Sequence, residues 1–409
     1  MSRLRRFLDR QARHFEKGAP LERLQPLWEA IDSFFYTPGE VTRGRVHVRD
    51  GLDLKRMMIV VVIALTPCVL WGMYNAGLQA NLALDPQKTG ELVGWRYAVI
   101  GLLGTGYDPG SLVANLVHGA LYFIPLYVVT MLVGGAWEVL FAVVRKHPIN
   151  EGFFVTGLIF PLILPATTPL WQVAIGISWG VVIAKEVFGG TGMNFLNPAL
   201  VARASLFYSY PLQITGDQVW TPIANSYWYD GYSGATVLAQ IKHGGMGQAG
   251  FDPSWWDAFL GFQLGSFGET SALACLIGAA LLLWTRIASW RVIAGVVVGT
   301  VLMASLLNGI GSETNPMFAL PFWWHMVLGG WAFATVFMVT DPVTSAFTER
   351  GKWIYGLLIG ALIVLVRVVN PAYPESAMLV ILFMNVFAPL IDHLVLKANI
   401  RRRLRRSEG

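Results

Sequence analysis

Residues 57–75 read "MMIVVVIALTPCVLWGMYN" and contain no charged side chain. A membrane-spanning helix needs about 20 mostly apolar residues, so this stretch predicts one span. The whole chain has the same character, because 55% of its 409 residues are hydrophobic and only 13% are charged. A soluble domain carries about 25% charged residues. We therefore predict an all-α polytopic membrane protein.

Further apolar stretches bring the prediction to about ten transmembrane helices. A long polar segment, 213–267, divides them into five and five. A repeat with an odd number of spans must insert in inverted orientation, and such repeats commonly build a midplane site from discontinuous helices. We predict two inverted five-helix repeats, with Gly/Pro-rich breaks in corresponding positions at 187–200 and 340–353. The predicted spans are 57–75, 112–143, 152–167, 169–188 and 195–212 in the first repeat (57–212), and 268–287, 290–308, 323–340, 353–370 and 376–396 in the second (268–396).

The distribution of lysine and arginine predicts the orientation in the membrane. The segment 1–56 holds twelve of the thirty basic residues, and the tail 397–409 holds six more. Because loops with excess Lys and Arg stay in the cytoplasm, both termini are predicted to be cytoplasmic, and 213–267 to be external. Residues 1–35 combine basic and apolar side chains in the pattern of an interfacial helix on anionic lipid. A surface for partner subunits is the alternative for this segment.

Several functional classes are disfavoured by missing motifs. The two cysteines lie in apolar runs and indicate neither a disulfide framework nor a metal site. No dinucleotide fingerprint follows a strand pattern, so the chain alone is not predicted to oxidise NADH. The basic net charge follows from membrane orientation and gives no reason to expect nucleic acid. Any redox centre in this chain must therefore be organic.

Charged side chains inside the predicted spans need a reason. An acidic residue at the centre of a span costs about 2.5–3.5 kcal/mol on insertion scales. Oxygen ligands in a pocket are the chemistry that binds a small cation taken from water. Alternatively, Arg203 and Arg367 neutralise these acids within the bundle. The acids concerned are Glu138, Glu151, Asp341 and Asp392.

Three residue pairs each allow a structural and a functional interpretation. Phe333 and Phe337 are spaced i, i+4 and indicate either core packing or a hydrophobic gate beside Asp341. Gly134 and Gly135 allow either a close helix contact or a flat aromatic ligand against the backbone. The third pair, Asn194 and Asn197, suits the polar edge of a heterocycle, or else satisfies backbone groups of a broken helix.

The stretch "DGYSGATVLAQ", residues 230–240, predicts a turn that leads into a helix. Taken alone, it predicts that Ser233 caps the helix and that Thr236 is a first-turn residue. Two classes of function remain open from the residues themselves. One is a solute channel or transporter with a midplane pore, and the other is a redox subunit that holds flavins and quinone.

Six long motifs carry a resemblance to a known family. The chain resembles the B subunits of the bacterial sodium-translocating NADH:quinone oxidoreductase, from about residue 1 to the C-terminus. The D subunits of the Rnf ferredoxin:NAD oxidoreductase are a sister family that shares the SGAT motif but lacks such an N-terminal extension. The motifs are "VRDGLDLKRMMIVVVIALTPCVLWGMYNAG", "VGGAWEVLFAVVRKHPINEGFFVTGLIFPLILP", "KEVFGGTGMNFLNPAL", "DGYSGAT", "FMVTDPVTSAFT" and "VRVVNPAYPESAMLVILFMNVFAPLIDH".

The resemblance implies roles for particular residues. It implies that Thr236 carries FMN through a phosphoester bond made by a separate external flavin transferase, and that Asn194 and Asn197 contact a non-covalent riboflavin. It implies a ten-helix fold similar to urea transporters. A ubiquinone region would involve Gly134, Gly135, Glu151, Gly152 and Phe154, and a cation pathway would involve Glu29, Glu138, Phe333, Phe337, Asp341 and Asp392.

The function expected from this resemblance is that of a membrane subunit in a respiratory redox-driven cation pump of the bacterial inner membrane. Electrons would pass through FMN and riboflavin to ubiquinone, in a complex with the A, C, D, E and F subunits as partners. The coupling ion, Na⁺ or H⁺, stays open, with no metal site beyond transported Na⁺. The alternatives are an Rnf-type D subunit and a flavin-free solute channel of urea-transporter-like fold.

Overall fold

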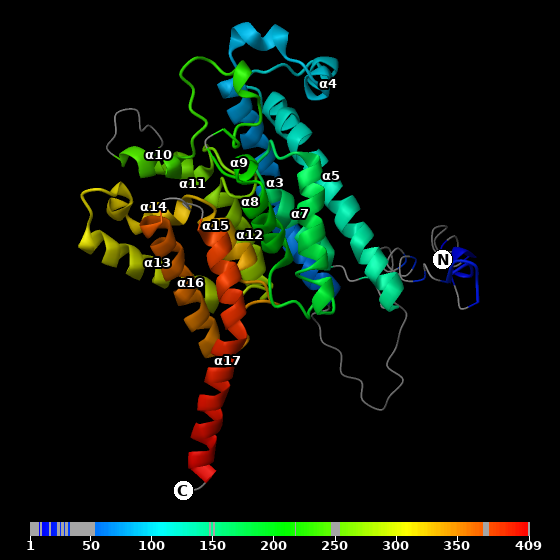
Figure 1. Ribbon diagram of the computed structural model, residues 1–409, viewed down its shortest axis with the longest axis vertical. Helices are drawn as coiled ribbons and strands as arrows, with labels where there is room; N and C mark the ends of the chain where they lie inside the picture. The colour runs from blue at the N-terminus through cyan, green and yellow to red at the C-terminus, as the bar shows by residue number, and fades with distance from the viewer. Residues whose placement is uncertain are drawn as a thin grey trace.

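A computed structural model of the chain describes residues 54–146, 149, 152–216, 218–246, 254–370 and 376–407, with scattered positions before residue 33. Over these residues the chain is helical and has no strand, apart from an isolated bridge between Leu84 and Trp228. The all-α prediction is therefore confirmed. Figure 1 shows the helices gathered into one bundle, with the C-terminal part of α17 projecting from it.

Six helices of the described chain are long and apolar enough to cross a membrane. They confirm that the chain is a polytopic membrane protein. α3 begins and ends beyond the predicted span 57–75, and α17 continues through most of the predicted basic tail, so that tail is helical as far as residue 407. These helices are α3 (Leu54–Ala83), α5 (Leu112–Arg145), α7 (Leu170–Val182, extended by the 3₁₀ turn η3, Glu186–Phe188), α13 (Trp290–Ile310), α16 (Glu349–Val369) and α17 (Ala377–Ser407).

Four of the predicted spans are shorter or broken. Proline and glycine explain most of these breaks, since Pro198 occupies the first position of α8 and two glycines with positive φ, Gly329 and Gly330, separate α14 from α15. The short elements are α6 (Gly152–Leu162), α8 (Pro198–Ser209), α12 (Ala272–Trp284) and the series α14 (Phe322–Val327), α15 (Trp331–Phe333) and η6, a π-helix over Ala334–Met338.

The remaining short elements lie outside the main spans. η2 (Pro86–Glu91) and α4 (Trp95–Leu103) follow α3, and η5 (Pro316–Ala319) precedes α14. The segment predicted as an external linker contains α9 (Pro211–Ile214), η4 (Asn225–Tyr227), α10 (Val237–Gly244) and α11 (Trp255–Leu260). In Figure 1, α4 and α10 lie toward the end of the bundle opposite the C-terminus.

Glycines let two pairs of long helices approach closely. A Cβ on Gly77 of α3 would lie 1.8 Å from the Asn115 carbonyl oxygen, and one on Gly119 of α5 would lie 1.7 Å from that of Met73. Gly299 and Gly360 make the equivalent contact between α13 and α16. Small residues at helix interfaces are the usual means of tight packing in membranes. These contacts fix the long helices around the short ones.

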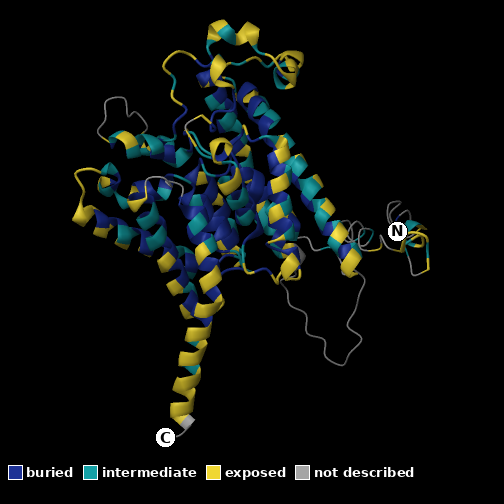
Figure 2. Cartoon of the chain, in the orientation of Figure 1, coloured by how far each residue is buried: buried dark blue, intermediate teal, exposed yellow. Residues whose placement is uncertain are grey.

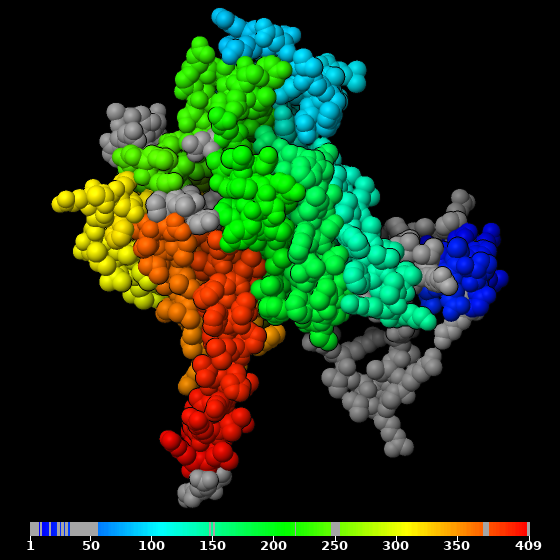
Figure 3. All heavy atoms as spheres, viewed as in Figure 1, coloured from blue at the N-terminus to red at the C-terminus, as the bar shows by residue number. Residues whose placement is uncertain are grey.

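The helix breaks meet in pairs inside the bundle. Asn197, at the start of α8, places its amide nitrogen 3.5 Å from a carboxylate oxygen of Asp341, which follows η6. The Gly268 amide, before α12, donates to the Leu162 carbonyl at the end of α6 across 2.8 Å. Figure 2 shows the buried residues gathered in the middle of the bundle, and on the face shown in Figure 3 the red α17 lies beside the green part of the chain, in line with its contacts to α8.

Candidate functional site

The two predicted breaks line one cavity. It encloses about 760 Å³ of empty space, part of it open to solvent. Its polar lining comes from both halves of the chain: Thr156, Lys185, Thr191, Asn194, Asn197, Thr340 and Asp341. The Thr191 hydroxyl is buried and has no hydrogen-bond partner among the described residues. A cavity with convergent polar groups in an apolar setting is the usual form of a ligand site.

The two asparagines in this cavity differ in how they are used. Asn197 caps α8, because its side-chain oxygen accepts from the amides of Ala199 and Leu200. Its amide nitrogen points toward Asp341 and the cavity. Asn194 accepts from the Gly192 amide at 3.3 Å and donates to the Leu196 carbonyl at 3.0 Å. Both asparagines therefore form hydrogen bonds with backbone groups of the broken helix. Asn197 also presents its amide N–H as a donor to a ligand.

Asp341 is the acidic side chain that lines the cavity. Its oxygens accept from the Val343 amide at 3.1 Å and from the Thr344 hydroxyl at 3.0 Å. No Lys, Arg or His side chain of the described part of the chain forms an ion pair with it. Asp341 therefore offers a carboxylate oxygen to the cavity.

The ion pairs inside the bundle are not those expected from sequence. Glu138 pairs with Lys185, and both side chains are buried. Arg203 pairs at 2.8 Å with Glu269, an acid at the edge of the predicted span 268–287.

Arg367 has a different set of partners again. It donates to the carbonyls of His325, Leu328 and Gly329, which belong to the broken helix around α14. Among these contacts, Arg203 thus pairs with an acid outside the predicted set, and Arg367 donates to backbone carbonyls.

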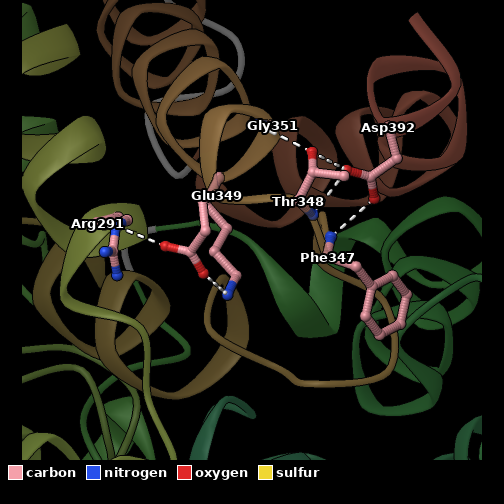
Figure 4. A network of polar contacts seen from close by, with 7 residues as sticks. Arg291, Phe347, Thr348, Glu349, Gly351 and Asp392 are labelled. Carbon is pink, nitrogen blue, oxygen red and sulfur yellow. Dashed lines mark hydrogen bonds and ion pairs between the residues drawn. The ribbon is translucent and has the colours of Figure 1, made fainter. Parts of the chain in front are cut away.

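Asp392 occupies a different environment from Asp341, although both were predicted to guide cations. Its carboxylate accepts from the Phe347 amide at 2.7 Å and from the amide and hydroxyl of Thr348 at 2.9 and 2.5 Å. Thr348 in turn caps α16 by accepting from Gly351 (Figure 4). Asp392 thus joins α17 to the start of α16.

Phe333 and Phe337 form a contact between ring centroids 5.1 Å apart. Phe333 is 1% exposed and packs on Gly268, whereas Phe337 is 4% exposed and lines the cavity. Both belong to the core, as the packing interpretation predicts. They lie on or beside the π-helix η6, a rare element that is frequent at functional sites.

The region predicted for quinone is only partly brought together. Gly134 allows close packing, since a Cβ there would lie 2.4 Å from the ring of Phe153. Gly135 is more open, with that ring 3.9 Å from a hypothetical Cβ. Gly152 lines the cavity, and Phe154 is 43% exposed on the bundle surface. Glu29 and Glu151 lie outside the described residues.

Thr236 is the N-cap of α10. Its hydroxyl oxygen accepts from the Ala239 amide at 3.2 Å, and its φ and ψ of −64° and 155° are typical of a cap. The prediction that Ser233 caps this helix is wrong, because the Ser233 hydroxyl accepts from the nearer Ala235 amide. Two cap-forming residues three positions apart cannot be ranked from sequence, since the backbone path decides between them.

A narrow cleft lies beside Thr236. It encloses about 350 Å³ of empty space, and its lining includes Gln263, Glu269, Thr270 and the two glycines 329 and 330. Thr270 has a buried hydroxyl without a hydrogen-bond partner among the described residues. The Gln263 amide donates to three carbonyls and ties the surrounding loops together. The Thr236 hydroxyl therefore starts a helix at the edge of a preformed cleft.

Sequence reasoning missed three residues of these sites. Lys185 lies inside the predicted span 169–188 and was not among the predicted site residues, but it is 3% exposed and lines the cavity. Thr191 and Phe153 lie within motifs that carry the family resemblance, but no role was predicted for either. An acid in a neighbouring span was the signal for Lys185, because a buried carboxylate needs a partner.

Known proteins are similar to this chain along nearly its whole length. Residues 41–401 match the NQR2, RnfD, RnfE family. The chain belongs to this family. Curated relatives named as the B subunit of "Na(+)-translocating NADH-quinone reductase" match nearly its full length. Those from Pseudomonas paraeruginosa and Azotobacter vinelandii are 57% and 58% identical over 407 residues, which is 99% of each chain. One from Chromohalobacter salexigens is 57% identical over 403 residues, 98% of this chain and 96% of the relative.

Proposed function

We propose that this chain is the B subunit, in the bacterial inner membrane, of a sodium-translocating NADH-quinone reductase. It works with the A, C, D, E and F subunits and carries electrons through FMN and riboflavin to ubiquinone, coupled to cation movement. Full-length identity of 56–58% to relatives of that name supports the proposal. In the same proposal both termini are cytoplasmic, and Thr236 lies on the external side.

Thr236 is the proposed attachment site of FMN, and its position carries the proposal. Its oxygen acts as an acceptor for the Ala239 amide, which leaves its own hydrogen to be replaced by a phosphate. The first N–H groups of a helix have no partner within the helix, and they favour an anion at that end. The adjacent cleft offers the unpartnered Thr270 hydroxyl. Bound flavin supplies one- and two-electron chemistry, and the chain supplies attachment and surroundings.

Riboflavin is assigned to the cavity with Asn194 and Asn197. Their amides and the unpartnered Thr191 hydroxyl suit hydrogen bonds with the polar edge of the flavin heterocycle. The apolar wall that includes Phe337 suits contact with the flavin rings. Asp341 belongs to the cation pathway in this proposal, since its carboxylate faces the same space. Gly135, Gly152 and the flanking surface of α5 and α6 are assigned to ubiquinone. These assignments rest on side-chain chemistry together with the family.

The attachment is tested by expressing the chain with its flavin transferase and recording flavin fluorescence of the denatured band. Thr236→Ala removes both the hydroxyl and the helix cap, a cap being worth about 1 kcal/mol. Thr236→Asn keeps a capping side chain but has no hydroxyl, so it separates the two effects. We expect no fluorescence from either variant, some from Thr236→Ser, and the full signal from Ser233→Ala. Fluorescence retained by Thr236→Asn would contradict the attachment site.

A second assay separates this function from that of an Rnf-type D subunit. The purified complex should reduce ubiquinone with NADH, at a rate that depends on the coupling cation. Ferredoxin-linked reduction of NAD without quinone reduction would favour the sister function instead.

A further inference from the structure

The ion pair between Glu138 and Lys185 lies at the wall of the cavity. Glu138 comes from α5, and Lys185 from the break after α7. Their side chains are 6% and 3% exposed. Lys185 lines the cavity, whereas Glu138 does not. Of the two partners, the lysine thus forms part of the cavity wall.

The charges around this cavity do not balance. Lys185 and Asp341 are the ionisable side chains among its described lining residues, and Glu138 is the ionic partner of the lysine. With all three ionised, two negative charges face one positive charge. One monovalent cation would restore neutrality, and in the described part of the chain Asp341 has no ionic partner of its own.

We propose that Lys185 is a tethered counter-ion that competes with the transported cation for the Glu138 carboxylate. This inference rests on the proposed cation-coupled function. A buried carboxylate left without a partner costs several kcal/mol, so the ammonium leaves only as another cation arrives. Lysine suits this exchange because its ammonium is a compact charge on a flexible stem. Asp341 provides a second carboxylate on the same cavity for the displaced ammonium.

The chain contains a matched ion pair that lacks the proposed role. Arg145 and Glu186 pair at 3.5 Å between the same two elements, since Arg145 follows Glu138 by two turns of α5 and Glu186 follows Lys185 directly. Neither residue lines the cavity. Removal of Arg145 thus also weakens the link between α5 and the break, but it leaves the cavity charge unchanged.

The test titrates NADH-driven quinone reduction by the whole complex against Na⁺ at fixed ionic strength. Lys185→Met makes the site more negative, and we expect a several-fold lower half-saturating Na⁺ concentration. Glu138→Gln makes it less negative and should raise that concentration several-fold. Lys185→Met combined with Glu138→Gln restores the original charge but lacks the carboxylate for which Na⁺ and Lys185 compete. Its half-saturating concentration should therefore fall back from that of Glu138→Gln toward wild type, without the gain expected for Lys185→Met alone. Arg145→Met should show the wild-type curve.

The double variant keeps the inference testable if Lys185→Met does not assemble. Half-saturation that fails to return toward wild type in the double variant, while Glu138→Gln alone is shifted, would overturn it. An equal shift in Arg145→Met and Lys185→Met would also overturn it, since that result indicates only a loosened break. A wild-type complex whose quinone reduction does not respond to any cation would instead refute the proposed function.

Discussion

The two ends of the helix bundle use their helix breaks differently. At one end, the breaks before α8 and before α16 line a cavity with about 760 Å³ of empty space, part of it open to solvent, and with an acid, Asp341, that has no ionic partner in the described chain. At the other end, the cleft beside Thr236 encloses about 350 Å³, and its acid, Glu269, is neutralised by Arg203. α15 and η6 run from one to the other, between Gly330 in the cleft and Thr340 in the cavity.

This difference indicates that the two sites hold different kinds of ligand. A narrow, neutral cleft suits a group that is attached covalently at one atom. The covalent bond holds the group, so the residues that line the cleft need to contribute little binding energy. A larger cavity with uncompensated charge suits a non-covalent ligand and a mobile cation. The rings of Phe333 and Phe337 pack between the two sites on the connecting helix. Each of the following variants changes one end and leaves the other as a control.

The largest effect is expected from Arg203→Met in the neutral cleft. Removal of one partner of a buried pair typically costs about 3–5 kcal/mol, because Glu269 would remain charged and buried. The melting temperature of the purified complex measures this loss. Arg291→Met is the matched control, since its pair with Glu349 is largely exposed and such pairs contribute about 0–1 kcal/mol (Figure 4). Equal melting temperatures for the two variants would mean that the cleft is not neutralised as described.

The next effect concerns the wider end. Asn194→Ala combined with Asn197→Ala should remove most of the extractable riboflavin, because both amides leave the cavity wall. Covalent flavin on Thr236 should be unchanged, since the two sites lie at different ends. Asn197→Asp provides a control that retains the helix cap on α8. An unchanged amount of extractable riboflavin in the double variant would contradict the assignment of riboflavin to this cavity.

The two adjacent glycines of α5 should separate packing from quinone reduction. A Cβ on Gly135 makes only an ordinary contact, so for Gly135→Leu we expect an assembled complex with several-fold slower quinol formation and normal flavin reduction by NADH. Gly134→Leu meets the ring of Phe153 and should lower assembly and every activity together. If both variants lose all activities in parallel, the glycines serve packing alone.

The smallest effect is expected from Asp341→Asn. Loss of one charged ligand should raise the half-saturating cation concentration a few-fold, with partial recovery at high salt. Thermal stability should change little, since the main donors to Asp341, Val343 and Thr344, lie in the same turn. Asp392→Asn should lower stability and leave the cation curve unshifted, since its carboxylate joins α17 to the start of α16. Cation curves shifted equally by both substitutions would show that the two acids share one role, as the sequence alone predicts.

The breaks could be located well from the sequence, because proline and glycine have fixed backbone consequences. The predicted breaks therefore contain Asn197, Pro198 and Asp341, which line the cavity, although no tertiary contact was known. Lys185 was not predicted as a site residue because a lysine near the end of a predicted span can reach water and needs no partner. Its burial depends on Glu138, which lies 47 residues earlier.

The sequence also did not show which side chains of a helix pack in the interior and which are exposed. In an almost wholly apolar helix such as α6, every face is equally hydrophobic, so the pattern does not distinguish Phe153, which faces Gly134, from the exposed Phe154. The partner of Arg203 was missed because Glu269 lies at the edge of a predicted span, where an acid can reach water and needs no partner.

The central claim is that this chain carries a covalent flavin on Thr236, and the intact mass of the wild-type chain tests it most directly. The chain would be expressed with its flavin transferase, purified and weighed, and then digested to map the modified peptide. We predict an added mass of one FMN less one water, confined to the peptide that contains Thr236. An unmodified mass, or the same addition on a peptide without Thr236, would contradict the claim.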